Sequence, residues 1–344
     1  LRVVDGACGV GKTAAVCRTR YLRWLVGLDN DSAFHRCPSN STGNCSLVSE
    51  IYHSVPRAVA GRPSQFLVDR SYENFVDEQV TAKRPSVLYA SSNDGFLHAF
   101  KIAQVDKANT SEAMQVKTKE TNELWTFVPP AVLPGIPGLF PAARQRLLDG
   151  SPAIKEVVAT DDSGGATYKF KLERGIDDAR AGVGKWRTIL VQSFGTQHPG
   201  YFAIDVTDPV PTGTGGPKFL WQLITDSTGK QLFGEGGGTP LITTVYLDKK
   251  EVAVAVLPGG YASTGIGTTG CNRAKMDWDI TPKPRTQVPC YTDKALLARS
   301  LTVVRLDSGE ILRTFRQAYA EVPGLVGKNV TTVAKIDSPM SGQP

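Results

Sequence analysis

The start of the chain matches a pattern that binds phosphate. Residues 6–13 read GACGVGKT and fit G-x-x-x-x-G-K-[ST] without a mismatch. In nucleotide-binding proteins the backbone N–H groups of such a loop hold the phosphates, the lysine (here Lys12) neutralises them, and the hydroxyl (here Thr13) binds Mg²⁺. The flanks agree locally, because LRVV suits a short strand and residues 14–28 carry apolar residues at helical spacing. Nucleotide binding through residues 6–13 is therefore one hypothesis.

The wider sequence opposes this hypothesis. A loop of this kind belongs to a parallel sheet with helical crossovers and needs a second carboxylate at a strand end for the metal. The residues that follow the first helix are turn-rich, and no apolar strand ending in Asp appears at a suitable distance. Cys8 lies inside the match and is a plausible disulfide partner of Cys17. We interpret residues 6–13 as a glycine-rich turn that precedes the first helix.

The chain has six cysteines, which form three couples close in sequence. Each couple lies in a region rich in Gly, Pro, Asn or Thr, where a covalent link stabilises most. None has the CxxC spacing of a zinc or redox site. We predict disulfides, which would place the protein outside the reducing cytosol, with buried free thiols as the alternative. The couples are Cys8 with Cys17, Cys37 with Cys45, and Cys271 with Cys290.

The other residues capable of catalysis or metal binding form no recognisable motif. The sequence has no HExxH and no GxSxG in a hydrolase setting. His98 directly follows a predicted turn, so we expect a packed or rim residue. The acidic doublets lack EF-hand spacing and are expected to be solvated turns. We therefore predict no catalytic, cofactor-binding or metal-binding residue. The residues considered were His35, His53, His98, His198, Asp161, Asp162, Asp177, Asp178, Asp277 and Asp279.

Composition favours a globular protein made of short strands. The 344 residues include 34 Gly and 22 Pro, which suit turns better than long helices. The net charge of +6 has no Lys/Arg block behind it, so we expect no nucleic-acid partner. No apolar stretch is long enough to predict a membrane span. The N-terminus has neither Met nor a signal-peptide pattern, so we expect a piece of a longer protein.

Three similar segments recur along the chain. They read LWTF from residue 124, LWQL from residue 220 and LRTF from residue 312. Each follows a strand, a turn and another strand, as in SVLYASSNDGFLHAFK. Such recurrence is typical of blade-type β architectures, and Trp125 and Trp221 are then core residues of blades.

The predicted fold class is therefore all-β. We expect a modified β-propeller, incomplete in this chain with about three and a half blades, and a short α-containing N-terminal segment. Residues 1–84 are predicted to be a lead-in with a helix and disulfide-bearing loops. Residues 85–344 are predicted to be the partial propeller, with inserted loops at 104–120 and 259–294 that present a binding surface.

A series of ordered motifs resembles one protein family. In chain order they read YLRWLVG, LVSEIYHSVPRAV, RPSVLYASSNDGFLHAF, ELWTFVPPAVLPG, LLDGSPAI, WRTILVQSFGTQHPGYFAIDVTDP and FLWQL. Their succession resembles the PilY/PilC family of bacterial type IV pilus proteins, which comprises tip-located adhesins and assembly factors. The resemblance extends over roughly residues 20–335.

The resemblance implies a propeller that promotes pilus assembly and extension, attaches to host or abiotic surfaces and supports twitching motility. It implies minor pilins and the pilus tip complex as partners. The implied location is the cell surface and pilus tip, the outer membrane or the periplasm. Several members carry an Asp-rich calcium loop, but residues 334–339 of this chain read AKIDSP. The resemblance leaves calcium binding open, but calcium control is not carried over to this chain, and we expect no cofactor.

Two enzymatic alternatives remain. Blades containing Leu-Trp also occur in quinone-dependent dehydrogenases, whose site needs converging Asp, Asn and Glu side chains, which we cannot assemble from this sequence. The second alternative is nucleotide binding through residues 6–13. We expect a protein that is not an enzyme.

Overall fold

The computed structural model describes residues 3–25, 48–65, 68–105, 112–114, 122–139, 145–161, 170–213, 215–262, 297–316, 331–333 and 340–342. Among the described residues the structure is mostly β, with 39% strand against 18% helix. This confirms the predicted class in its coarser form, a mostly β protein, and the propeller stays a prediction.

The described strands are β1 (Arg57–Val59), β2 (Pro85–Ser91), β3 (Leu97–Val105), β4 (Glu112–Met114), β5 (Glu123–Phe127), β6 (Pro152–Asp161), β7 (Phe170–Lys171), β8 (Glu173–Gly175), β9 (Lys185–Ser193), β10 (Tyr201–Asp205), β11 (Lys218–Leu223), β12 (Leu241–Leu247), β13 (Lys250–Pro258), β14 (Ser300–Arg305), β15 (Ile311–Arg316) and β16 (Thr331–Val333). The helices are α1 (Ala14–Leu25), α2 (Arg70–Thr81), α3 (Ile176–Arg180) and the 3₁₀ helix η1 (Pro130–Leu139).

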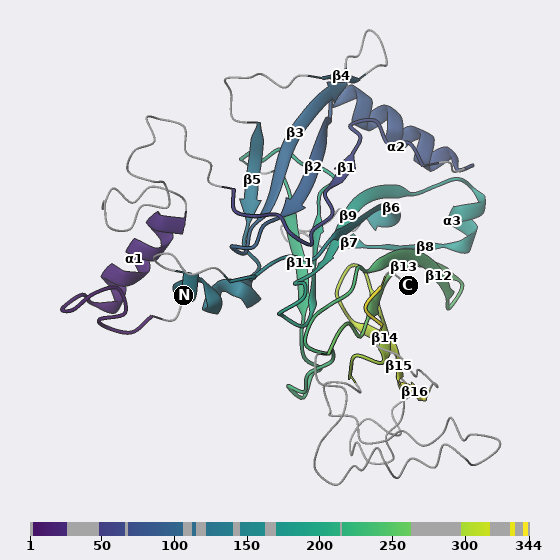
Figure 1. The fold of residues 1–344 in the computed structure, drawn as a ribbon. Helices are drawn as coiled ribbons and strands as arrows, with labels where there is room; N and C mark the ends of the chain where they lie inside the picture. Colours follow the sequence, from purple (N-terminus) through teal and green to yellow (C-terminus); the bar gives the residue numbers. More distant parts are fainter. Residues whose placement is uncertain are drawn as a thin grey trace, which may run out of the picture.

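The strands of the described ranges form three sheets, and each sheet contains one antiparallel meander of four strands in chain order (Figure 1). We call these meanders module 1 (β1, β2, β3, β5), module 2 (β6, β9, β10, β11) and module 3 (β12, β13, β14, β15). Short strands add to them: β4 pairs with β3, β7 with β6, β8 with β13 and β16 with β15. The strand β1 comes from the predicted lead-in, yet it pairs with β2.

The core lies between successive modules. In β9 the side chain of Leu190 belongs to a cluster shared with module 1, whereas its neighbours Ile189 and Val191 belong to a cluster shared with module 3. In β10, Phe202 belongs to the cluster shared with module 1, and Tyr201 belongs to the cluster shared with module 3. Side chains alternate between the two faces of a strand. Module 2 therefore buries both faces, one against each neighbour.

The three similar segments predicted from the sequence are the fourth strands of the modules, β5, β11 and β15. In each, the pairing register with the third strand shifts by one residue, as between Ala99 and Phe100. The residue left over is the leucine of the segment, Leu124, Leu220 or Leu312. This is a β-bulge, in which one extra residue bends the strand and increases its twist. The sequence recurrence thus reports a recurrent backbone feature.

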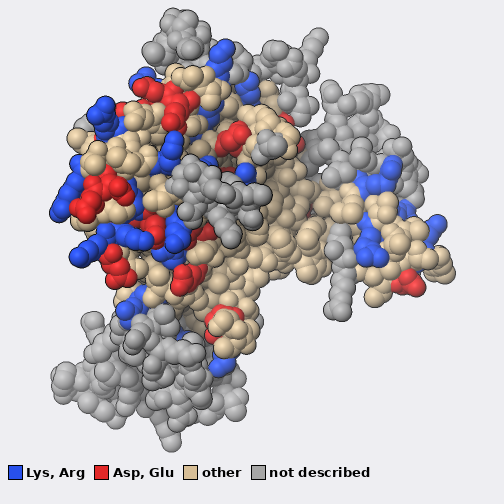
Figure 2. Space-filling model, turned by 180° about the vertical axis from the view of Figure 1, so that it is seen from behind, with Lys and Arg blue, Asp and Glu red and all other residues tan. Residues whose placement is uncertain are grey.

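The helices lie outside the sheets. α1 lies beside the body near the N-terminus, and α2 crosses above the β6–β9 region (Figure 1). Trp24 and Leu25 at the end of α1 join the cluster between modules 1 and 2. None of the helices in the described ranges has the length and hydropathy needed to cross a bilayer. On the face shown in Figure 2, basic and acidic side chains are intermixed.

Candidate functional site

Three N–H groups of the loop that matches the phosphate-binding pattern donate to carbonyl groups of the same loop. Gly6 N donates to Lys12 O (2.7 Å), Gly9 N to Gly6 O (3.1 Å) and Lys12 N to Gly9 O (3.2 Å). The preceding residues Val3 and Val4 are irregular, so these two do not form the strand predicted there. A phosphate needs such N–H groups free and directed at the ligand.

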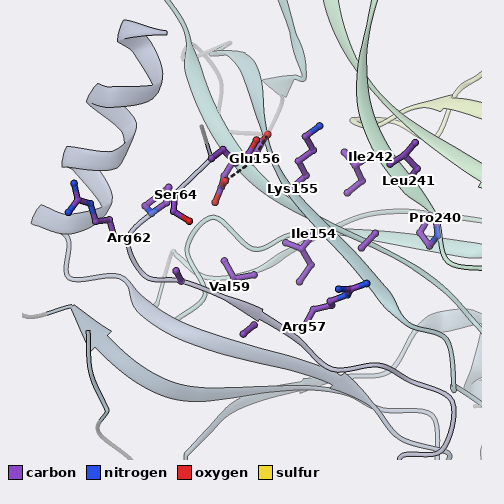
Figure 3. A pocket seen from close by; sticks show the side chains of 15 residues that line it. Arg57, Val59, Arg62, Ser64, Ile154, Lys155, Glu156, Pro240, Leu241 and Ile242 are labelled. Atoms are coloured by element: carbon purple, nitrogen blue, oxygen red, sulfur yellow. Dashed lines mark hydrogen bonds between the residues drawn. The ribbon is translucent and has the colours of Figure 1, made fainter. Parts of the chain in front are cut away.

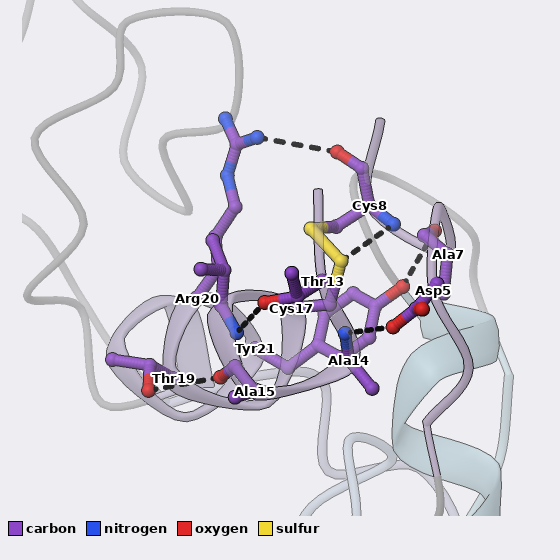
Figure 4. The surroundings of a disulfide bond; sticks show 11 residues. Asp5, Ala7, Cys8, Thr13, Ala14, Ala15, Cys17, Thr19, Arg20 and Tyr21 are labelled. Atoms are coloured by element: carbon purple, nitrogen blue, oxygen red, sulfur yellow. Dashed lines mark hydrogen bonds between the residues drawn. A yellow bond between two sulfur atoms is a disulfide. The ribbon is translucent and has the colours of Figure 1, made fainter. Parts of the chain in front are cut away.

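The N-terminus of α1 is occupied by a carboxylate. Asp5 Oδ1 accepts a hydrogen bond from Ala14 N (2.6 Å), where a bound phosphate would have to lie (Figure 4). Cys8 and Cys17 form a disulfide inside the match, with their Cα atoms 5.3 Å apart, and Tyr21 Oη donates to Ala7 O (2.8 Å). The loop is a covalently linked cap of a helix, which supports the structural interpretation over nucleotide binding.

Only the first of the predicted cysteine couples falls where the structure can show it. Cys8 and Cys17 are bonded, whereas Cys37, Cys45, Cys271 and Cys290 lie outside the described residues, as do His35, Asp162, Asp277 and Asp279. Among the described residues, no group of three or more His, Cys, Asp or Glu side chains is arranged to hold a metal ion. Asp177 and Asp178 lie exposed in α3, where Asp177 pairs with Arg180 (3.3 Å).

One cluster in module 1 has the residue types of a hydrolase triad. His98 Nε2 lies 2.9 Å from Ser92 Oγ, and His98 Nδ1 lies 2.5 Å from Glu123 Oε1. The hydroxyl of Ser92, however, donates its proton to Asp94 rather than to His98. Ser92 is 0% exposed and His98 is 3% exposed, so a substrate cannot reach the hydroxyl. The cluster fixes the β2–β3 turn, and His98 is packed, as predicted.

Both tryptophans of the recurrent segments reach into the next module. Trp125 Nε1 donates to Pro209 O (2.9 Å), and Trp221 Nε1 donates to Leu306 O (2.8 Å). Each acceptor lies in the hairpin between the third and fourth strands of the following module. Buried indole N–H groups need an acceptor, so the ring and the hydrogen bond together fix one module on the next.

The DGSP motif joins modules 1 and 2. The Asp149 carboxylate is buried; it accepts hydrogen bonds from Thr196 N (2.7 Å) and Thr196 Oγ1 (2.6 Å), and it lies 2.6 Å from His53 Nδ1. Ser151 Oγ accepts from Val55 N (3.0 Å). Gly195 has φ +113°, and a Cβ there would lie 1.8 Å from Asp149 Oδ1, so only glycine fits. We call these contacts, together with that of Trp125, the joint 1–2.

The corresponding contact between modules 2 and 3 is made mainly by backbone. Gly237 N donates to Gly195 O (2.8 Å), and a Cβ at Gly237 would lie 2.6 Å from Ser193 Cβ. Tyr201 Oη donates to Pro258 O (2.7 Å) and accepts from Gly238 N (3.1 Å). We call these contacts, together with Trp221, the joint 2–3.

An insertion of module 2 also crosses to module 3. The strand β8 lies between β6 and β9 in sequence but pairs with β13. Its Glu173 forms ion pairs with Lys250 (2.6 Å) and Arg305 (2.9 Å), and Arg174 pairs with Asp69 (2.7 Å) and Glu251 (2.7 Å). These ion pairs tie β8, α2 and module 3 together.

Two cavities lie where modules meet. The first strands of all three modules line a cavity of ≈ 580 Å³ (Figure 3), which we call the inner cavity. A second, of ≈ 820 Å³, lies beside the joint 1–2 and is lined by His53, Arg146, Thr196, Gln197, Pro199, Gln231, Glu235 and Tyr261. We call it the loop cavity.

Sequence reasoning noticed the tryptophans and DGSP but not their contacts. The role of Asp149 and the bulges required three-dimensional pairing. One signal was available, because Gly150-Ser151-Pro152 and Gly238-Thr239-Pro240 share the pattern Gly-[Ser/Thr]-Pro before a first strand.

Known proteins similar to this chain were found both by sequence and by structure. No protein-family model matches the sequence. The type IV pilus biogenesis factor PilY1 of Pseudomonas aeruginosa strain PAK is 28% identical over 230 residues, which are 63% of this chain and 15% of the relative. The PilY1 homolog of Xylella fastidiosa strain Temecula1 is 28% identical over 257 residues, 74% of this chain and 16% of the relative. The chain thus matches less than a fifth of either relative.

A solved structure, the C-terminal domain of Pseudomonas aeruginosa PilY1, resembles this chain with a TM-score of 0.42 and 20% identity, covering 77% of this chain and 38% of that one. The sequence matches confirm the predicted resemblance. The chain is a distant homologue of the type IV pilus biogenesis factor PilY1.

Proposed function

We propose that this chain is the scaffold region of a type IV pilus biogenesis factor and that it acts without catalysis. The observation that carries the proposal is the homology to PilY1 in two bacteria, over 63% and 74% of the chain. The motifs that resemble the family, DGSP and the Leu-Trp segments, lie in the joints between modules. They therefore serve the scaffold rather than a reaction.

We further propose that the modules are blades of a modified β-propeller. Two features support this arrangement. The first strands β1, β6 and β12 converge on the inner cavity, as inner strands of blades do around an axis. The apolar faces of module 2 are covered by its neighbours, which is the packing expected of repeated sheets around an axis.

In this proposal the protein lies at the pilus tip or cell surface, or in the outer membrane or periplasm. It promotes pilus assembly together with minor pilins and supports surface attachment and twitching. The predicted recognition loops, 104–120 and 259–294, fall mostly outside the described residues. The loop cavity beside the joint 1–2 is a second surface available to partners.

The enzymatic alternatives find little support. A calcium–quinone site needs several converging acids, but Glu156 is the one acid among the residues that line the inner cavity. The phosphate-loop alternative conflicts with the Asp5 cap and with the internal hydrogen bonds of residues 6–13.

Deletion of the gene region that encodes this chain tests the proposal. We expect fewer surface pili and reduced twitching, measured by electron microscopy and by zone diameter. Expression of the intact chain within its full protein restores both, and so does the Lys12→Ala variant, because Lys12 has no role in the scaffold. Normal piliation after deletion, in a strain without a paralogue, contradicts the proposal. Loss of pili with a folded Lys12→Ala protein instead restores the nucleotide hypothesis.

A further inference from the structure

The start of the described chain stands to one side of the three sheets (Figure 1). We call residues 3–25 the N-terminal unit; it consists of the loop closed by the Cys8–Cys17 disulfide, the residues before that loop, and α1. Trp24 and Leu25, at the end of α1, attach the unit to the core between modules 1 and 2. Most of the other side chains of the unit are exposed.

This end of the chain is basic. The first 47 residues contain six basic residues and three acids, so they supply half of the chain's net charge of +6. In Figure 2 the N-terminal unit is the lobe on the right, where basic side chains outnumber acidic ones. The one acid of the unit, Asp5, already accepts a hydrogen bond from Ala14 N. Arg18 and Arg23 are exposed, and the Arg18 side chain has no hydrogen bond or ion pair within the described residues.

The same unit exposes large aliphatic side chains. Val4 is 73% exposed and Val10 is 102% exposed, and both precede α1. On α1 itself, Val16 is 48% exposed and Leu22 is 49% exposed. These side chains do not surround a groove, since neither the inner cavity nor the loop cavity is lined by residues of the unit.

The exposed apolar and basic side chains of α1 share one face. Side chains three or four residues apart are neighbours on a helix surface. Val16, Thr19 and Arg23 therefore form one exposed row. Leu22 lies beside Thr19, and Arg18 lies one turn before Leu22. The buried side chains form the opposite face, which consists of Cys17, Tyr21, Trp24 and Leu25.

This face is held in place by contacts within the chain. A helix of 12 residues is marginally stable by itself in water. Here the Cys8–Cys17 disulfide, the hydrogen bond from Tyr21 Oη to Ala7 O (2.8 Å) and the burial of Trp24 stabilise it. A partner therefore meets a formed helix, and binding requires little ordering of the backbone.

We propose that the N-terminal unit docks on an anionic lipid surface, with Val16 and Leu22 inserted between the headgroups and with Arg18 and Arg23 at the phosphates. Helices that lie in a membrane interface combine aliphatic side chains with Arg and Lys, whose apolar stems remain among the lipids while the charged ends reach the headgroups. Single aliphatic side chains without a groove fit a deformable surface better than a rigid acidic protein. The site is independent of the pilus function proposed above, since it rests on the charge and exposure of this unit alone.

Binding to vesicles tests the proposal directly. The purified chain is sedimented with vesicles of phosphatidylcholine alone and with vesicles that also contain the anionic lipid phosphatidylglycerol. We expect binding to the mixed vesicles, little binding to phosphatidylcholine alone, and weaker binding when NaCl is added, because salt screens the attraction. No binding to the mixed vesicles, or equal binding to both kinds, overturns the proposal.

A charge reversal locates the surface on α1. Arg18→Glu should weaken binding to the mixed vesicles by about fivefold or more, the factor contributed by one basic residue near an anionic membrane. Arg180→Glu makes the same change at an exposed position of α3 and should bind as the intact chain does. Equal weakening by the two variants shows an attraction to the overall charge of the chain and contradicts a site on α1.

A polar substitution tests insertion. Leu22→Gln keeps the length of the side chain and should weaken binding severalfold, whereas Val183→Gln, at an exposed position between α3 and β9, should leave binding unchanged. Urea unfolding verifies that the variants are folded, and Val16→Gln replaces Leu22→Gln if the latter is unstable. Unchanged binding by a folded Leu22→Gln, with weakening by Arg18→Glu, shows that charge alone attracts the unit; this overturns the lipid surface and favours an acidic protein as the partner.

Discussion

The joint 1–2 and the joint 2–3 share a backbone plan and differ in side chains. In both, a tryptophan follows a bulged leucine and donates to a carbonyl of the next module. At the joint 1–2, Asp149 fills the space beside Gly195 with a buried carboxylate, whereas at the joint 2–3 the backbone N–H of Gly237 bonds to Gly195 directly. The two joints thus repeat one backbone arrangement, and different groups complete its hydrogen bonds.

The two joints also differ in how strongly other contacts support them. Module 3 receives the extra strand β8 and the ion pairs of Glu173 from module 2. Trp221 is 6% exposed, whereas Trp125 is only partly buried. This difference suggests that the joint 2–3 is the more deeply packed of the two, and each prediction below addresses it.

The largest effect is expected from removing the tryptophans. Trp221→Ala should lower the free energy of unfolding by about 3–5 kcal/mol, because it deletes a buried ring and leaves Leu306 O without its donor. Trp125→Ala should cost roughly half as much, since its ring is less buried. Urea unfolding measures both. Equal losses, or a larger loss for Trp125, contradict the ranking of the joints.

The next effect concerns the buried acid of the joint 1–2. Asp149→Ala should cost about 2–3 kcal/mol, because Thr196 N and Oγ1 lose their acceptor. At the joint 2–3 we expect an added methyl group to destabilise the fold. Gly237→Ala should lower the free energy of unfolding by about 1–3 kcal/mol, because the new Cβ would crowd Ser193. Both are measured by urea unfolding, with the exposed Lys185→Ala as the control. A neutral Asp149→Ala shows that the carboxylate does not hold the joint.

A smaller, pH-dependent effect is expected at Glu173. Burial favours a higher pKa for this carboxyl, but the hydrogen bonds from Lys250 and Arg305 outweigh burial and lower the pKa below its ordinary value of 4.5. The carboxylate therefore stabilises the fold fully above about pH 4.5, and this contribution is lost as the pH falls through the folded-state pKa. Glu173→Gln should cost about 1–2 kcal/mol at pH 7, and the difference from the intact chain should shrink at lower pH. A difference that is constant with pH disproves this origin.

The smallest effect is expected at His198, in the loop that carries the joint 1–2. Burial lowers the pKa of His198 below its ordinary value of 6.5, and the charge of Asp149 opposes this only in part. The unfolded chain then binds the proton first, so the intact chain loses stability as the pH falls below 6.5 toward the folded-state pKa. His198→Gln should flatten this part of the profile of stability against pH. An unchanged slope shows that another group titrates there.

Much of the fold could be predicted because its signals are local. Alternation of apolar residues and turn dipeptides such as Asp94-Gly95 predicted β2 and β3. The recurrent segments LWTF, LWQL and LRTF predicted three equivalent places in a repeated unit of strand, turn and strand. The Cys8–Cys17 disulfide was predicted from a short spacing in a turn-rich segment. The phosphate-loop match shows the limit of local patterns, since the same letters form a helix cap whose N–H groups bond within the loop.

The site could be predicted only in part, because its contacts join residues far apart in sequence. Trp221 and Leu306, or Asp149 and His53, meet only after the strands have paired. The pairing of β8 with β13 was not predicted, since a short insertion carries no signal of which sheet it will join.

The sequence by itself determined the strand content, the repeat of the modules and the distant homology to PilY1, because each depends on residue types at short or regular spacing. The tertiary structure alone decided which carbonyl each tryptophan bonds, which face of module 2 meets which neighbour, and that Arg57 and Lys155 line one cavity. The physical reason is that hydrogen bonds and charges act over a few ångströms in space, and the folding of the sheets sets those distances.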